Sequence, residues 1–359
     1  MKKFTIILAA LMFCLPVTAS AQNYSSSSQT SQASSADAND PSKMLPQEIQ
    51  TRFENIRRDP DPDALVRDAH YWVSNENAHY VWYPYVKDLG GVISGVGTDQ
   101  VYLIAGWSNA SLILPMDFDR MITNLHYAYG AAFLSANNIE EFRSYWKSDN
   151  PDLMKAALEK YFPDKAADAF KAWKHGVKEV NGRFNRVIKK YTKSEETEIT
   201  SVPTFLTDET QYKRIKKLWE NHRVFPICGD LTGNKAMIDI AKALRDSNMK
   251  MMILYPSNAE GYFEYTPEYR RNIVNMPFED KSLVLRTRQM RSLGLAEEED
   301  YHYNMQSGEN FQLWLKTTNI PDQHKMLRKR TKTAREGLSV LDYRPEPSKK
   351  LPKLADMPE

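Results

Sequence analysis

The stretch that decides the fold is GGVISGVGTDQVYLIAGWSNASLILPMDFD, residues 90–119. Its apolar run over 92–96 predicts a buried strand, Gly95 and Gly97 then form a Gly-x-Gly turn, and a helix is expected over 98–107. Glycine permits the tight turn and lets backbone amides approach a cofactor, while the N-terminus of the following helix favours an anion. This order of strand, glycine turn and helix is typical of a nucleotide-type binding site.

A second apolar run, 112–116, continues the pattern and ends in Asp117 and Asp119. These acids lie 20 and 22 residues beyond Gly97, where a carboxylate can accept hydrogen bonds from ribose hydroxyls. The glycine pattern lacks its third member, because Asp99 stands two residues after Gly97 and would repel a pyrophosphate. S-adenosylmethionine has no pyrophosphate and therefore fits the turn better than NAD. A purely structural βα turn is the alternative.

Two further apolar runs, 224–230 and 251–255, end in polar side chains. In an open α/β sheet, ligands bind outside the carboxyl ends of the strands. The side chains expected to face the same crevice as Asp117 are Asp230, Ser257, Asn258 and Glu260. Asp230 and Glu260 are candidate acid/base groups, and the alternative for all four residues is that they cap the helices that follow.

Other candidate site residues lie outside these strand ends. Ser74, Asn75 and Glu76 precede the first strand and either cap a helix or close over the site on the substrate side. His302, in the polar segment His-Tyr-Asn, is a further candidate acid/base group. The seven histidines show no metal-ligand spacing, and Cys228 is the single cysteine after residue 21. We therefore expect no metal site and no internal disulfide.

The first 21 residues have the pattern of a secretory signal peptide. Lys2 and Lys3 precede an apolar stretch over 4–17, and Ala-Ser-Ala at 19–21 is a cleavage site. The apolar stretch is too short for a membrane span, so a periplasmic or secreted protein is expected. Because the two lysines account for the net charge of +2, the remaining chain is near neutral. Bulk charge therefore gives no argument for a nucleic-acid or membrane partner, and a small-molecule ligand is expected.

Composition and periodicity divide the remaining chain into three parts. Residues 22–59 form a Ser/Gln-rich flexible leader with a short helix, 60–343 an α/β domain, and 344–359 a Pro/Lys-rich disordered tail. Strands that alternate with helices predict a mostly parallel sheet, and a helical insertion is expected at about 137–222. A terminal helix is expected over 325–341, with its basic residues forming a solvated face.

Five short segments together resemble one family, an uncharacterised bacterial family of conserved hypothetical proteins with an S-adenosylmethionine-dependent-methyltransferase-like Rossmann domain. They run in order over about 70–320: Val73-Ser74-Asn75-Glu76, 95–100 with 117–120, Gly229-Asp230 with Gly233 and Lys235-Ala236, 257–262, and 302–306 before Phe311 and Trp314. In this family Asp99-Gln100 follows the glycines. The resemblance implies a Rossmann-like (methyltransferase-like), mostly parallel sheet with a helical insertion, but no established reaction.

Three functions remain open at this stage. The first is an exported methyltransferase-like enzyme that uses S-adenosylmethionine. Its cofactor side would comprise Gly95, Gly97, Asp99, Gln100, Asp117 and Asp119, and its substrate side Ser74, Asn75, Glu76, Ser257 and Asn258. The second is a non-catalytic small-ligand-binding module on the same fold. The third is an acid/base hydrolase or transferase without a nucleotide cofactor, in which Asp230, Glu260 or His302 is the acid/base group. Substrate and oligomeric state are undetermined by the sequence.

Overall fold

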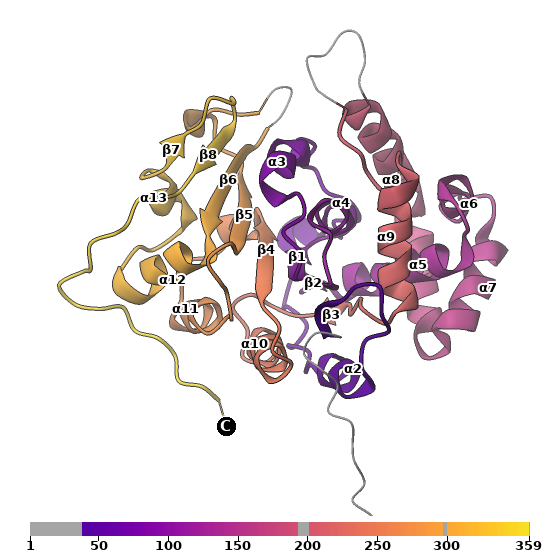
Figure 1. Cartoon of the computed structure of the whole chain (residues 1–359), viewed down its shortest axis with the longest axis horizontal. Helices are drawn as coiled ribbons and strands as arrows, with labels where there is room; N and C mark the ends of the chain where they lie inside the picture. Colours follow the sequence, from indigo (N-terminus) through magenta and orange to yellow (C-terminus); the bar gives the residue numbers. More distant parts are fainter. Residues whose placement is uncertain (1–37, 193–200, 297–299, 359) are drawn as a thin grey trace, which may run out of the picture. The chain divides into compact units, whose positions relative to one another are not determined.

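The computed structural model describes residues 38–192, 201–296 and 300–358 (Figure 1). The predicted signal peptide and residues 22–37 of the predicted leader lie outside this part of the chain. The chain divides into Met1–Gln32 and a compact unit, Ala33–Glu359, and the description below concerns the second. Among the residues that the structure describes, no helix is long and apolar enough to cross a membrane.

An eight-stranded sheet of order β3-β2-β1-β4-β5-β6-β8-β7 forms the centre of this unit. The strands are β1 Val92–Val96, β2 Leu112–Asp117, β3 Ile227–Cys228, β4 Met251–Ser257, β5 Leu283–Arg288, β6 His302–Ser307, β7 Thr331–Lys332 and β8 Leu338–Val340. Strands β1 to β5 are parallel, β6 is antiparallel to β5, and β7 is antiparallel to β8. The sheet is mixed and mostly parallel, which confirms the predicted α/β class.

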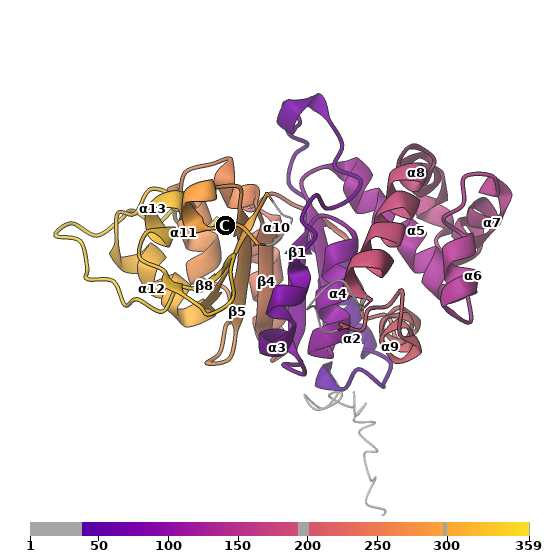
Figure 2. The same cartoon turned by 90° about the horizontal axis from the view of Figure 1, so that it is seen from above.

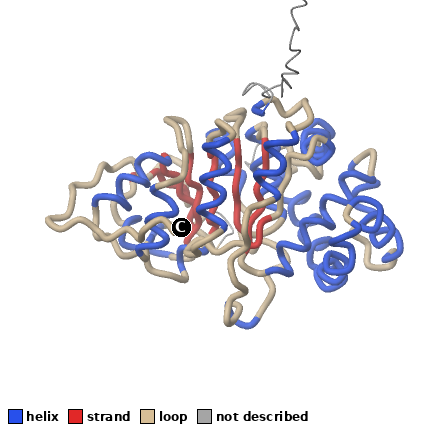
Figure 3. Tube along the Cα trace, turned by 90° about the horizontal axis from the view of Figure 1, so that it is seen from below, coloured by secondary structure: helices blue, strands red, loops and turns tan. Residues whose placement is uncertain are grey.

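Helices cover both faces of the sheet (Figure 3). One core lies between the sheet and α3 Tyr83–Val86, α4 Asp99–Ser108, α5 Arg120–Ser135, α8 Ala166–Tyr191 and α9 Glu209–Glu220. The other lies between the sheet and α2 Gln47–Glu54, α10 Ala236–Asp246, α11 Pro267–Val274 and α12 Gly308–Thr317. Neighbouring side chains of a strand point to opposite faces, so Val92 joins the second core and Ile93 the first. Burial on both faces explains why the strands read as continuous apolar runs.

The segment predicted as a helical insertion, about 137–222, is helical: it holds α6 Ile139–Ser144, α7 Pro151–Tyr161, the short η3 Pro163–Lys165, α8 and α9. Side-chain caps begin two of these helices. Asn138 accepts a hydrogen bond from the Glu141 amide before α6, and Asp208 accepts one from the Gln211 amide before α9, each at 2.9 Å. In Figure 1 the insertion lies next to α4, at the β1–β2–β3 end of the sheet.

The C-terminal region differs from the prediction. The expected helix over 325–341 is wrong, since α13 Gln323–Leu327 is short and the chain returns as β7 and β8. Gly337 makes this return possible: its φ is +72°, and a Cβ there would lie 2.1 Å from the Ala296 backbone nitrogen. Leu338 is buried at the sheet edge, so tertiary contacts override the helical spacing.

Both ends of the described chain are tied to the sheet and its helices. The guanidinium of Arg223 donates hydrogen bonds to the carbonyls of Ala38 and Lys43, at 2.7 and 2.8 Å. The segment 344–358, predicted to be disordered, is extended, and its Ser348 amide donates to the Thr317 carbonyl at 2.9 Å. Residues at the edges of the predicted leader and tail thus contact the domain.

Candidate functional site

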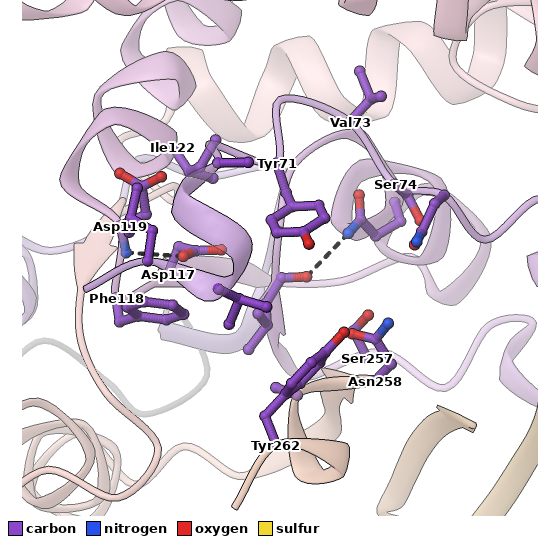
Figure 4. Close-up of a pocket in the computed structure, with 18 residues that line it drawn as sticks. Tyr71, Val73, Ser74, Asp117, Phe118, Asp119, Ile122, Ser257, Asn258 and Tyr262 are labelled. Carbon is purple, nitrogen blue, oxygen red and sulfur yellow. Dashed lines mark hydrogen bonds between the residues drawn. The ribbon is translucent and has the colours of Figure 1, made fainter. Parts of the chain in front are cut away.

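A cavity of about 100 Å³ lies at the point where the strand order reverses. The chain runs from β1 towards β2 and β3 on one side, and β4 and β5 lie on the other. In parallel sheets, ligands bind outside the carboxyl ends of the strands at such a point. Gly97 after β1, Asp117 at the end of β2, and Ser257 and Asn258 at the end of β4 all line the cavity. Figure 4 shows the acids on one side of it and Ser257 and Asn258 on the other.

The glycine turn contributes Gly97 and Gln100 to this cavity. Gly97 has a φ of +98°, and a Cβ there would lie 2.0 Å from the Gln100 amide nitrogen. The Gln100 side chain donates to the Val96 carbonyl and accepts from the Thr98 amide, both at 3.1 Å. The Gly97 amide donates to the Met116 carbonyl at 3.3 Å. Amides that could surround an anion are thus bound to the protein itself, which disfavours a pyrophosphate.

Gly95 and Asp99, the other predicted residues of this turn, do not line the cavity. A Cβ at Gly95 would lie 3.1 Å from the Val101 side chain, so glycine here permits close packing of strand and helix. Asp99 is fully buried and accepts a 2.9 Å hydrogen bond from Nε of Arg183 on α8. Burial alone would lower the pKa of Arg183, but Asp99 outweighs it and raises that pKa above its ordinary value. Asp99 therefore joins α4 to the helical insertion.

Asp117 presents a nearly buried carboxyl group, 8% exposed, to the cavity. Burial raises its pKa to about 7, and the neighbouring charge of Asp119 acts in the same direction. The backbone amides of Asp119, Gly97 and Phe118 oppose this rise, and the Asp119 amide lies 2.9 Å from Oδ1. Near neutral pH the group is close to half ionised, so it can accept or donate a hydrogen bond.

Asp119 caps α5 and holds a histidine that the sequence did not single out. Its Oδ1 accepts from the Met121 amide at 2.9 Å, and its Oδ2 accepts from Nδ1 of His70 at 2.6 Å. His70 belongs to the segment 61–75, which includes the short helix η1 Val66–Asp68 and supplies several residues to the cavity wall. In Figure 2 this segment is the purple loop that projects at the top of the view. The His70–Asp119 pair joins it to the end of β2.

Beneath the cavity, Glu76 forms a buried polar network. Its carboxylate accepts hydrogen bonds from Ser257 at 2.6 Å, from Nε2 of His79 at 3.1 Å, and from the hydroxyls of Tyr255 and Thr287. Burial alone would raise the pKa of Glu76, but the hydrogen bonds and charge of its partners outweigh it and hold the pKa below the ordinary value. Glu76 does not line the cavity, and the Ser257 hydroxyl donates its hydrogen bond to Glu76.

Two of the remaining substrate-side candidates, Asn75 and Asn258, contact the same tyrosine. Asn75 and Asn258 both donate from their side-chain amides to the hydroxyl of Tyr301, at 2.6 and 3.1 Å. Burial, together with the charge of Glu76, raises the pKa of Tyr301 to about 12. Ser74 lines the cavity as well and accepts a hydrogen bond from the Glu76 amide at 3.1 Å. Asn75 and Asn258 therefore join the two sides of the cavity through Tyr301.

Asp230, a candidate acid/base group, does not line the cavity. Its Oδ1 accepts from the amide and the hydroxyl of Thr232, at 2.7 and 2.8 Å, as expected for a residue that closes its own turn. The amides at the start of the following helix, α10, donate to a different carboxylate. Asp59 accepts from the amides of Asp230 and Lys235, each at 3.0 Å, and from that of Ala236.

Glu260 and His302 also lie outside the cavity wall. Glu260 is buried in η4 Ala259–Gly261 and accepts from Nε of Arg286 at 2.7 Å. His302 donates from Nδ1 to the Gly294 carbonyl at 2.6 Å and accepts from the Ser339 hydroxyl at 2.7 Å. Burial lowers the pKa of His302 to about 4. Across the described ranges, no group of three or more His, Cys, Asp or Glu side chains could hold a metal ion.

The sheet and the cavity at its carboxyl edge define a class of protein: an α/β domain with a cavity of about 100 Å³ at the reversal of strand order. The chain belongs to the family of the domain of unknown function DUF7790, whose sequence profile matches residues 71–342. No curated protein matches the chain. The family match confirms the expected membership of an uncharacterised family. The matched residues contain the strands and most of the cavity wall.

Proposed function

We propose that the crevice binds a small ligand with a ribose-like pair of hydroxyls, and that this ligand is S-adenosylmethionine. The observation that carries the proposal is the position of Asp117, which lines the cavity at the end of β2 and close to the Gly97 turn. Parallel strands in the order β3-β2-β1-β4-β5 are also the arrangement of doubly wound nucleotide-binding sheets. This order supports a Rossmann-like, methyltransferase-like fold.

The chemistry of the cavity wall agrees with this ligand. The Asp117 carboxylate would accept hydrogen bonds from the ribose hydroxyls. The rings of Tyr71, Phe118 and Tyr262 line the same cavity and offer apolar faces for a planar base. Because the amides of the Gly97 turn are already bound, the site suits a cofactor without a pyrophosphate. When bound, S-adenosylmethionine would supply a methyl group for transfer to an acceptor.

Export is part of the proposal and sets a condition on it. The segment 1–21 would direct the chain out of the cytoplasm, where S-adenosylmethionine is made. The protein would therefore act inside another cell or on a carried supply.

A non-catalytic ligand-binding module is the second candidate, and one observation favours it. Ser257, Asn75 and Asn258 are all committed to Glu76 or Tyr301, which leaves few groups free for chemistry.

Titration calorimetry of residues 22–359 with S-adenosylmethionine and S-adenosylhomocysteine tests the proposal, since these residues contain the whole compact unit. We expect Asp117→Ala to weaken binding by about 10- to 100-fold, the loss of hydrogen bonds to a charged group. Because the ionised carboxylate is the better acceptor and its pKa is about 7, affinity should rise about tenfold between pH 6 and pH 8.

Asp230→Ala is the matched control for this titration, because Asp230 also follows a strand but does not line the cavity. It should leave the affinity unchanged. Absence of heat at millimolar ligand would reject S-adenosylmethionine, and an Asp117→Ala variant with full affinity would reject the ribose assignment. Binding without methyl transfer to any acceptor would favour the second candidate.

The cavity is too small for this ligand as it stands. Its volume of about 100 Å³ lies below the ~300–1,000 Å³ of typical ligand pockets. The segment 61–75 must therefore move to admit the ligand. Two contacts with the start of α5 hold it, the His70–Asp119 hydrogen bond at 2.6 Å and the Asp61–Arg120 ion pair at 2.5 Å. The second is exposed and contributes little, so His70 is the main attachment.

His70→Ala should loosen this segment. Loss of one partly exposed, charge-assisted hydrogen bond corresponds to about 1 kcal/mol, or about fivefold more frequent opening. Hydrogen–deuterium exchange of peptides covering 61–75 should accelerate by this factor, while exchange in β1 and β4 stays unchanged. His324→Ala on α13 is the control, because Nε2 of His324 contacts the guanidinium of Arg328 and not the segment 61–75. Unchanged exchange in the His70 variant would show that other contacts hold the segment.

A further inference from the structure

Charge is distributed unevenly along the chain. Residues 323–353 contain ten lysines and arginines and three acids, a net charge of +7. The chain after residue 21 is neutral overall, so the remainder carries −7. The bulk charge, which offers no argument for an anionic partner, is the sum of these two opposite parts. A local positive field can bind an anionic surface even when the net charge is zero.

The elements that carry these residues, α13, β7 and the extended segment that follows β8, lie at one end of the sheet (Figures 1 and 2). Nine of the ten cations are exposed, and seven of these are called the basic edge: Lys325, Arg328, Lys329, Lys332, Arg344, Lys349 and Lys350. Three cations are not counted with it: the half-buried Arg330 donates to the Leu293 carbonyl, Arg335 lies over the Tyr80 ring, and Lys353 faces Glu268.

The basic edge is not neutralised by the protein. Within the described ranges, none of its seven cations forms an ion pair with an acid. Two neighbouring acids serve other groups: Asp322 caps α13, and Asp342 accepts from the Thr331 hydroxyl. Glu346 lines the same groove as Lys325 and Lys329 but forms no ion pair with them. Lys325 and Lys329 line one surface groove together with Tyr343, and Lys329 Nζ lies 5.4 Å from the centre of that ring.

Apolar side chains are exposed beside these cations. Tyr343 and Leu351 are 42% and 61% exposed, and they are two of the seven large apolar side chains that are exposed in the described chain. A surface that combines unpaired lysines with exposed apolar groups suits the boundary of a lipid bilayer, where phosphates lie above acyl chains. A nucleic acid would bind the cations but would leave the apolar side chain of Leu351 exposed to water.

We propose that the basic edge binds the surface of an anionic lipid membrane, as a peripheral contact without insertion of a helix. The cations would lie against lipid phosphates, and Tyr343 and Leu351 would reach the headgroup boundary. The proposal is independent of the ligand in the crevice, because the basic edge shares no residue with that cavity. It holds whether or not S-adenosylmethionine binds.

Cosedimentation with vesicles tests this proposal, using residues 22–359 so that the apolar signal segment is absent. We expect binding to vesicles that contain phosphatidylglycerol, no binding to pure phosphatidylcholine, and release as the salt concentration rises. The variant K325E/K329E/K332E should bind about 100-fold more weakly, because three attractive charges become repulsive. Near-identical far-UV circular dichroism and melting temperature would establish that the variant is folded.

The matched control is K171E/K174E/K178E, which makes the same charge change on the exposed face of α8. It should retain most of the binding to anionic vesicles. Equal loss in both variants would overturn the proposal, since net charge and not the basic edge would then decide binding. Absence of binding at low salt would overturn it too. So would capture by an RNA or an acidic protein in place of the vesicles.

Discussion

Replacement of Asp99 by alanine is expected to lower the free energy of unfolding by about 3–5 kcal/mol. The variant leaves the guanidinium of Arg183 buried, 1% exposed, without its carboxylate. Asn77 would remain as an uncharged acceptor at 2.6 Å, which is not enough to stabilise a buried cation. Urea denaturation of residues 22–359 at pH 7, followed by tryptophan fluorescence, measures the loss as a lower midpoint.

Two further variants identify the cause of that loss. Asp99→Ala combined with Arg183→Leu removes both charges and should recover much of the stability, because a buried ion pair replaced by apolar groups is often close to neutral. Glu159→Ala breaks an exposed pair with Lys155 and should change the stability by less than about 0.5 kcal/mol. A stable Asp99→Ala protein that no longer binds S-adenosylmethionine would instead restore the predicted cofactor role of this acid.

The parallel part of the sheet could be predicted because burial on two faces gives an unambiguous signal. The apolar run 92–96 coincides with β1, and the runs at 112–116 and 251–255 lie within β2 and β4. The C-terminal edge could not be predicted in the same way. There the strands are only two and three residues long, and Gly337 fits against the Ala296 backbone, which no local pattern records.

The cavity was predictable at its strand ends and not elsewhere. Asp117 and Ser257 follow from the rule that parallel strands bring their carboxyl ends together. Asp99 is in the same turn as Gly97, yet it faces away because Arg183, 84 residues later, supplies a buried partner. His70 lies 49 residues before Asp119 in an irregular segment, so no spacing could have linked the two.

Replacement of Glu76 is expected to cause the second large loss in the free energy of unfolding. Glu76→Ala removes an acceptor that serves Ser257, His79 and two further hydroxyls, all inside the protein. Buried donors left unpaired cost about 1–3 kcal/mol each, part of which relaxation recovers, so we expect a total loss of about 4 kcal/mol. Glu76→Gln keeps the shape and one carbonyl oxygen, and should lose about half as much. Chemical denaturation at pH 7 gives both values.

The same carboxylate gives a pH dependence whose sign follows from its pKa. The folded pKa lies below the ordinary value of 4.5, so the folded protein releases this proton more readily than the unfolded chain. The stabilisation is therefore fully present above pH 4.5 and is lost as the pH falls through the folded pKa. Glu76→Gln, which has no proton to bind, should show a shallower loss of stability below pH 4.5 than the parent protein. Parallel acid profiles for the two proteins would mean that folding does not lower the pKa of Glu76. The attachment of residues 74–79 to the ends of β4 and β5 would then depend on packing and uncharged hydrogen bonds, and not on the charge of Glu76.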